Sequence, residues 1–150
     1  MRNKIICIVC VIIFCISTQN ACVTKKYSVS YYENTGVHVE KDDVTLISSM
    51  DELNEYKSLT RFQESSEEFK VKLESYSSEF FQEKMLIVVN IEEITGSSDI
   101  SLKDINYTNS EANLVFKRKI PKIVDNSMKI WSFFVEIDVC EIEKANYTLE

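Results

Sequence analysis

Histidine, glycine and proline are nearly absent from this chain of 150 residues. It has one histidine, His38, two glycines, Gly36 and Gly96, and one proline. A single histidine excludes zinc sites built on paired histidines, and a Ser–His–acid or Cys–His–acid triad would need His38 to fold back onto the domain. Two isolated glycines exclude a glycine-rich phosphate loop, and neither a G-x-S-x-G elbow nor an S-x-x-K dyad occurs. These absences favour a non-catalytic protein without a cofactor or a bound metal.

Carboxylates, in contrast, are abundant enough to be considered as catalytic or calcium-binding groups. Adjacent residues on a strand point to opposite faces, so Glu92 and Glu93 make a poor catalytic pair. We expect a solvated acidic surface, and a carboxylate-based hydrolase remains a remote alternative. The other candidate carboxylates are Asp42, Asp43, Asp138, Glu141 and Glu143.

The charge balance is acidic. The chain has 17 Lys and Arg against 24 Asp and Glu, which gives a formal net charge of −7. An acidic chain is repelled by phosphate backbones, so nucleic-acid binding is not expected.

The first 22 residues resemble an export signal. Arg2 and Lys4 precede an apolar run at residues 5–16, which is too short to span a bilayer, and polar residues then lead to Ala21 and Cys22. A small residue followed by cysteine is similar to the end of bacterial lipoprotein signals, although Gln19 and Asn20 stand where that pattern has an apolar residue and then a small one. We therefore predict a signal peptide at residues 1–21 and an extracytoplasmic protein held at a membrane by acyl chains on Cys22. Ordinary secretion after a cut near Ala21 is the alternative.

Removal of the signal changes both the charge and the cysteine count. Losing Arg2 and Lys4 takes the formal net charge from −7 to −9, and the only cysteines that remain are Cys22 and Cys140. We expect Cys140 to be a small buried hydrophobe. A Cys22–Cys140 disulfide is the alternative if Cys22 carries no lipid.

Two helices are predicted after a polar leader. Residues 22–43 are interpreted as a tether with an added strand near residues 27–32, and a single globular domain is predicted at residues 44–150. Capping boxes at residues 49–52 and 65–68 open the helices. Apolar residues then recur at helical spacing. These residues are Leu53 and Tyr56 in the first helix and Phe69, Leu73 and Tyr76 in the second.

Strand patterns dominate the rest of the chain. Residues 85–89 form a continuous apolar run, typical of a strand buried on both faces, and residues 90–98 are interpreted as a polar loop. Further strands are predicted at 99–107, with a bulge near 103–104, at 114–120 and at 145–149. The clearest alternation is at residues 131–139. The predicted fold class is α+β, with two short helices packed on a mainly antiparallel β-sheet.

Three segments together resemble a known family. They are residues 76–89, where an acidic residue and an aromatic pair precede a buried strand, residues 95–98, and residues 125–138. This layout looks like the C-terminal domain of the protease complex subunit PrcB family and its uncharacterised bacterial lipoprotein relatives, over residues 44–150. In that family the loop at 95–98 is richer in glycine and often holds an aromatic residue.

The resemblance implies a non-catalytic envelope protein that binds another exported or envelope protein, such as a protease. The alternative is a lipoprotein that binds a small solute or a cell-wall glycan through the Gly96 loop and the Trp131 end of the sheet. Trp131 belongs to an apolar stripe, which favours the core over a binding anchor. The candidate contact residues are Gly96, Ser97, Ser98, Asp125, Met128 and Trp131.

Overall fold

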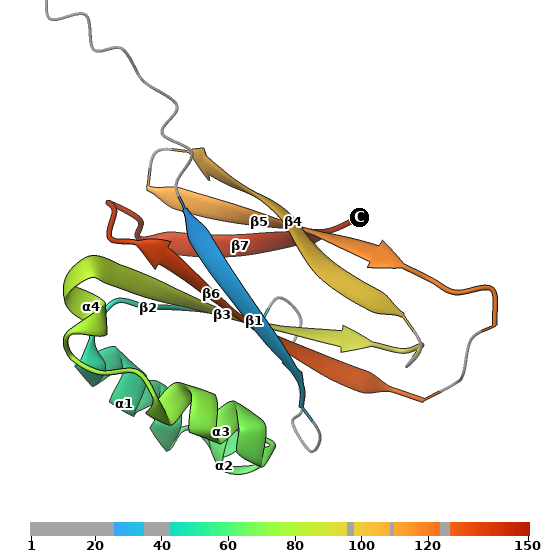
Figure 1. Ribbon diagram of the computed structural model, residues 1–150, viewed down its shortest axis with the longest axis horizontal. Coiled ribbons are helices and arrows are strands. Elements are labelled where there is room, and N and C mark those ends of the chain that lie inside the picture. Colours follow the sequence, from blue (N-terminus) through green and yellow to red (C-terminus); the bar gives the residue numbers. More distant parts are fainter. Residues whose placement is uncertain (1–25, 35–42, 96–97, 109, 124–126) are drawn as a thin grey trace, which may run out of the picture.

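The chain folds into three layers (Figure 1). The computed structural model describes residues 26–34, 43–95, 98–108, 110–123 and 127–150. Helices cover one face of a four-stranded sheet, and a three-stranded sheet packs on its other face. The predicted α+β class, with helices on a mainly antiparallel sheet, is confirmed.

The helices and strands account for most of the described residues. In chain order they are β1 (Tyr27–Glu33), β2 (Val44–Ile47), α1 (Met50–Ser58), α2 (Thr60–Gln63), α3 (Glu67–Glu74), α4 (Phe80–Glu83), β3 (Lys84–Glu93), β4 (Asp99–Thr108), β5 (Glu111–Lys119), β6 (Lys129–Asp138) and β7 (Lys144–Leu149).

The strands form two sheets where the sequence suggested one. The first has the order β1-β6-β3-β2 and is antiparallel throughout. The second has the order β4-β5-β7, in which β4 and β5 form an antiparallel hairpin and β7 returns parallel to β5. The alternation of apolar and polar residues within each strand can be seen in the sequence. The partner of each strand cannot, because it depends on contacts between residues far apart in the chain.

Strand β3 lies between the two cores of the molecule. Met85, Ile87 and Val89 face the core between the sheets, whereas Leu86 and Val88 face the helices. All five side chains are buried, so the prediction that residues 85–89 form a strand covered on both faces is confirmed.

The helices begin at serine caps. The Ser49 hydroxyl accepts a hydrogen bond from the Glu52 amide at 3.2 Å, as predicted, and the Glu52 carboxylate reaches back to the Ser48 amide at 2.6 Å. The second cap is Ser66 and not the predicted Ser65, because it is the Ser66 hydroxyl that accepts from the Phe69 amide. The predicted apolar faces of both helices are buried.

The folded part begins before Val44, where the sequence placed its start. The strand expected near residues 27–32 is present as β1, which pairs with β6 along its whole length. Asn34, just after β1, and Asp43, just before β2, are both buried. The strand was therefore predicted, but the polar composition of this stretch concealed that it belongs to the domain and that Asn34 and Asp43 are buried.

Strand β3 is also longer than predicted. It continues through Asn90 to Glu93, so the polar loop predicted at residues 90–98 starts too early. In β4 the predicted bulge is confirmed by a register shift between Leu102 and Asp104. The bulge places Ile100 and Ile105, which alternation alone would put on opposite faces, in the same core.

Candidate functional site: a groove between two strand edges

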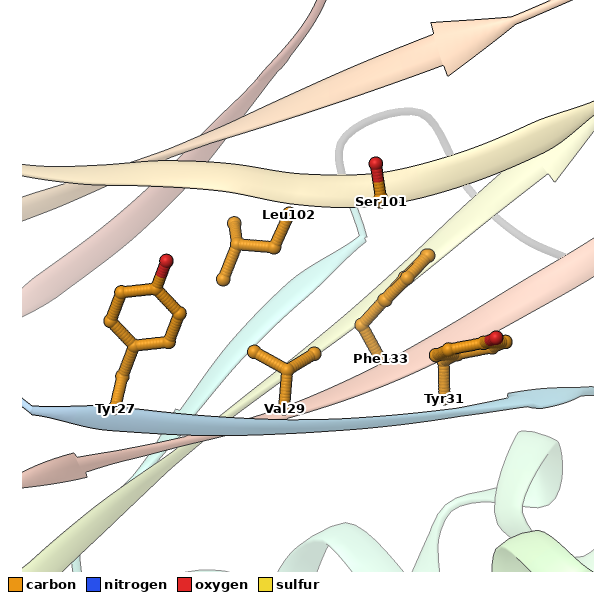
Figure 2. A pocket seen from close by; sticks show the side chains of 6 residues that line it. All are labelled: Tyr27, Val29, Tyr31, Ser101, Leu102 and Phe133. Atoms are coloured by element: carbon orange, nitrogen blue, oxygen red, sulfur yellow. The ribbon is translucent and has the colours of Figure 1, made fainter.

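A groove of about 330 Å³ lies where the two sheets separate (Figure 2). The side chains of Tyr27, Val29 and Tyr31 rise from β1 toward β4, and Leu102 of β4 points back toward them. None of the lining residues carries a charge. We call this site the β1–β4 groove, and its lining consists of Tyr27, Val29, Tyr31, Ser101, Leu102 and Phe133.

Aromatic rings form one end of the groove. The Tyr31 ring lies 5.8 Å from the rings of both Trp131 and Phe133, measured between centroids. Phe133 is fully buried, whereas Tyr31 is 58% exposed and Tyr27 is 40% exposed. The groove therefore has a rigid apolar floor and two tyrosines open to solvent, a composition that is common at protein interfaces.

The two strands beside the groove differ in how their free edges are protected. Both are terminal strands of their sheets in the described part of the chain. Strand β4 carries a bulge and three charged residues, Asp99, Lys103 and Asp104, which discourage pairing with another strand. Strand β1 has no bulge in its register with β6, and from Tyr27 to Tyr32 it has no charge and no proline.

Titratable groups gather near the Tyr27 end of the groove. Burial, together with the nearby Cys140, Asp138 and Tyr27, raises the pKa of Tyr107 to about 12, so its phenol is protonated at neutral pH. Cys140 is half-buried against the core between the sheets and has no disulfide partner among the described residues. Cys22, its predicted alternative partner and the predicted lipid site, lies outside the described residues.

The structure separates the predicted contact residues that it describes. Trp131 is half-buried beside Tyr31, with Lys129 Nζ 5.9 Å from its ring centre. Its indole Nε1 is buried and has no hydrogen-bond partner among the described residues. Met128 is exposed at the end of the sandwich. Ser98 is buried, and its hydroxyl lies 2.5 Å from that of Thr95, so it belongs to the turn and presents no contact surface.

The remaining predicted contact residues, Gly96, Ser97 and Asp125, lie outside the described residues. The groove residues of β1 were missed because the strand expected near residues 27–32 was interpreted as part of a tether and not as part of the domain. Tyr27, Val29 and Tyr31 stand at alternate positions, and that spacing is the signal that could have identified a strand face.

A chain of buried polar side chains connects β1, β6, β3 and the start of β2. Asn34 Nδ2 donates to Ser132 Oγ at 3.0 Å, and Ser132 Oγ donates to Asn90 Oδ1 at 2.6 Å. Asn90 Nδ2 in turn donates to Asp43 Oδ2 at 2.9 Å. The side-chain oxygen Asn34 Oδ1 also accepts from the Ser66 amide at 2.9 Å, at the start of α3. We interpret this chain as structural, because each side chain is engaged by its neighbours.

A second polar cluster fastens α3 and β1 to β6. Glu136 accepts hydrogen bonds from Lys72 Nζ at 2.8 Å, from the Tyr76 hydroxyl at 2.9 Å and from Ser28 Oγ at 2.8 Å. Burial opposes ionisation of Glu136, but these hydrogen bonds outweigh it and hold the pKa of the carboxyl below its usual value. Burial and the Glu136 charge raise the pKa of Tyr76. At neutral pH the carboxylate is therefore ionised and fully engaged within the fold.

A buried carboxylate at the end of β3 has a similar role. Glu93 accepts from Arg118 Nη1 at 3.4 Å and from the Thr95 amide at 3.2 Å.

Within the described residues, no three His, Cys, Asp or Glu side chains come close enough to hold a metal ion together. The helices of the described part also lack the length and apolar character needed to cross a membrane.

Comparison with known proteins gives no match to any family model, curated protein or solved structure. The resemblance to the PrcB family therefore stays a prediction from the sequence pattern.

Proposed function

We propose that this chain is a non-catalytic interaction module that holds an extended segment of another exported protein along β1. The observation that carries the proposal is the free edge that β1 has in the described part of the chain, uncharged from Tyr27 to Tyr32, directly beside an open apolar groove. A free strand edge supplies backbone donors and acceptors, and a groove beside it accepts side chains. This combination is the recognition mode in which a peptide adds a strand to a sheet.

The edge of β1 is the better of the two edges for such pairing. An added strand needs an uninterrupted row of backbone N–H and C=O groups, and β1 offers seven residues in continuous register with β6. The bulge in β4 breaks that row, and Lys103 and Asp104 would have to be desolvated. The partner segment is therefore expected to extend the four-stranded sheet.

The groove would select the side chains of the partner. Alternate residues of an added strand point to the same face as Tyr27, Val29 and Tyr31, that is, toward the groove. Tyrosine is enriched among the residues that dominate binding energy, and Tyr31 is both exposed and backed by Phe133 and Trp131. A partner with apolar residues at every second position fits this surface.

Charge adds a further preference. The mature chain carries a large excess of acidic residues, while the groove itself is neutral. Lysine or arginine at the ends of a partner segment would be attracted by the acidic surface, which favours encounter more than affinity.

The predicted localisation is part of the proposal: the domain is exported and attached to a membrane by acyl chains on Cys22. Its support is the signal-like composition of residues 1–21 and the small residue before Cys22. The mass of the mature protein purified from its native membrane tests it. A chain that begins at Cys22 with the added mass of acyl chains is expected, and an unmodified Cys22 would contradict the anchor.

Peptide display against the mature domain tests the groove. We expect the selected extended peptides of about ten residues, the length of a long strand, to alternate apolar and polar residues. In NMR titrations a selected peptide should shift the β1 amides and protect them from exchange. The Tyr31→Lys variant should bind it about tenfold more weakly or worse, because a charge replaces an aromatic contact.

Val71→Lys is the matched control. Val71 is 63% exposed, close to the 58% of Tyr31, but it lies on α3, on the other side of the four-stranded sheet. It should bind the peptide as the wild type does. Equal affinity of the wild type and Tyr31→Lys, or shifts confined to other strands, would overturn the proposed site.

One observation keeps the small-ligand alternative as a second candidate. The groove volume of about 330 Å³ lies at the lower end of the range for small-ligand pockets, and the exposed tyrosines could stack on a sugar ring. A glycan that raises the melting temperature of the wild type but not of Tyr31→Lys would support this candidate over a peptide.

A further inference from the structure

Large apolar side chains are exposed at the end of the sandwich where β3 and β5 finish. They come from the connection between β3 and β4 and from the connection between β5 and β6. We call them the apolar tip: Ile94, Ile120, Ile123 and Met128, which are 69%, 54%, 87% and 64% exposed.

The strand register brings the members of the tip to one place. Glu93 pairs with Lys129, so Ile94 and Met128 continue neighbouring strands of the first sheet. In the second sheet Asp99 pairs with Lys119, so Ile120 follows at the end of β5. Figure 1 shows that β3 and β5 end, and β4 and β6 begin, at the same end of the molecule, on the right.

Unpaired lysines accompany the apolar tip. Lys117, Lys119 and Lys122 are exposed and have no ion pair in the described part of the chain, and Asp99 makes none with Lys119 although it lies opposite. Most other described lysines are paired with a carboxylate, as Lys72 is with Glu136. Residues 117–123 therefore combine unneutralised positive charge with exposed isoleucines in a chain whose net charge is −7.

We infer that the apolar tip inserts into the surface of an anionic lipid bilayer, with Lys119 and Lys122 against the headgroups. Apolar side chains that enter the acyl boundary and cations that bind anionic lipids are the two components of peripheral membrane binding. This site is separate from the β1–β4 groove and does not depend on the proposed peptide.

The shape of the tip favours a bilayer over a protein partner. Residues that dominate protein interfaces sit in well-packed pockets surrounded by contacts that exclude water. The tip instead projects: Ile123 is 87% exposed, and Ile94 and Met128 are both more than 60% exposed. Projecting apolar side chains reach a soft acyl boundary without needing a complementary cavity.

The position of the apolar tip also affects the orientation of the domain relative to the membrane. Tyr27 pairs with Ile137, at the opposite end of β6 from Lys129, so the chain enters the sandwich at the end far from the tip. A domain held by an anchor at Cys22 and by the tip would lie with its strands along the plane of the membrane.

Vesicle co-sedimentation of the mature chain with Cys22→Ser tests the inference without any contribution from a lipid anchor. At about 0.1 M salt we expect binding to vesicles that contain phosphatidylglycerol and at least about tenfold weaker binding to pure phosphatidylcholine. The double variant Ile120→Ser/Ile123→Ser should reduce binding by about tenfold or more. Lys119→Gln/Lys122→Gln should reduce binding and its dependence on salt.

The matched control is Val71→Ser/Val139→Ser, which removes two exposed valines away from the tip and should bind as the starting protein does. Tyr31→Lys should also leave vesicle binding unchanged, so a failure here is distinct from a failure of the proposed groove. All these substitutions are on the surface, so an unchanged melting temperature shows that each variant is folded. Absence of binding to anionic vesicles, or equal binding by the isoleucine variant, would overturn the inference.

Discussion

Phe134→Ala is expected to lower the free energy of unfolding by about 3–5 kcal/mol, the range for an aromatic side chain removed from a core. Phe134 is fully buried and projects from β6 into the core beneath the helices. Its ring lies 5.0 Å from the ring of Phe69 on α3 and 5.7 Å from that of Tyr32 on β1. Loss of the ring would leave a cavity between the sheet and the helices, and denaturant unfolding followed by circular dichroism measures the cost.

Two further variants make this result specific. Phe134→Leu keeps an apolar side chain and should cost clearly less than Phe134→Ala. Val71→Ala removes an exposed side chain from α3 and should change stability by no more than about 0.5 kcal/mol. A Phe134→Ala protein as stable as Val71→Ala would mean that α3 does not pack on this face of the sheet.

The apolar pattern of the sequence predicts part of both cores: Val88 faces the helices, and Phe133 lies between the two sheets. Val88 and Phe133 were expected to be buried because they belong to a continuous apolar run and to an alternating stripe, and both are fully buried. Each pattern is set within one strand by side-chain direction, so it can be read without knowing the partner strand.

Buried polar residues could not be predicted in the same way. Asn90 and Glu93 looked like loop residues, yet both are buried in β3. Their burial depends on Asp43, Ser132 and Arg118, which lie far away in the sequence and meet them only after the sheets have formed. Nothing local in the sequence distinguishes a satisfied buried amide from a solvated one.

The groove has the same dependence on distant contacts. The alternation of Tyr27, Val29 and Tyr31 is visible in the sequence, but the opposite wall is Leu102 of a different sheet. The predicted contact residue Trp131 reached the neighbourhood of the groove because it flanks Phe133 on the same face of β6. Ser98 did not, because its hydroxyl is used within its own turn.

Asn90→Leu should lower the free energy of unfolding by about 2–4 kcal/mol, because a buried amide with partners on both sides is replaced by an apolar group of similar size. The Asp43 carboxylate would lose the Nδ2 donor at 2.9 Å, and the Ser132 hydroxyl would lose the Oδ1 acceptor at 2.6 Å. Asn113→Leu is the matched control, since Asn113 forms an exposed pair with Thr148 and should cost less than about 1 kcal/mol.

A double-mutant cycle separates the hydrogen bond from other effects of Asn90→Leu. Ser132→Ala removes the hydroxyl that Asn90→Leu leaves without its acceptor, so the double variant should cost less than the sum of the two single variants. Strict additivity would show that Asn90 and Ser132 act independently. Coupling between them would show that the Asn90–Ser132 hydrogen bond, the middle link of the polar chain from Asn34 to Asp43, stabilises the fold.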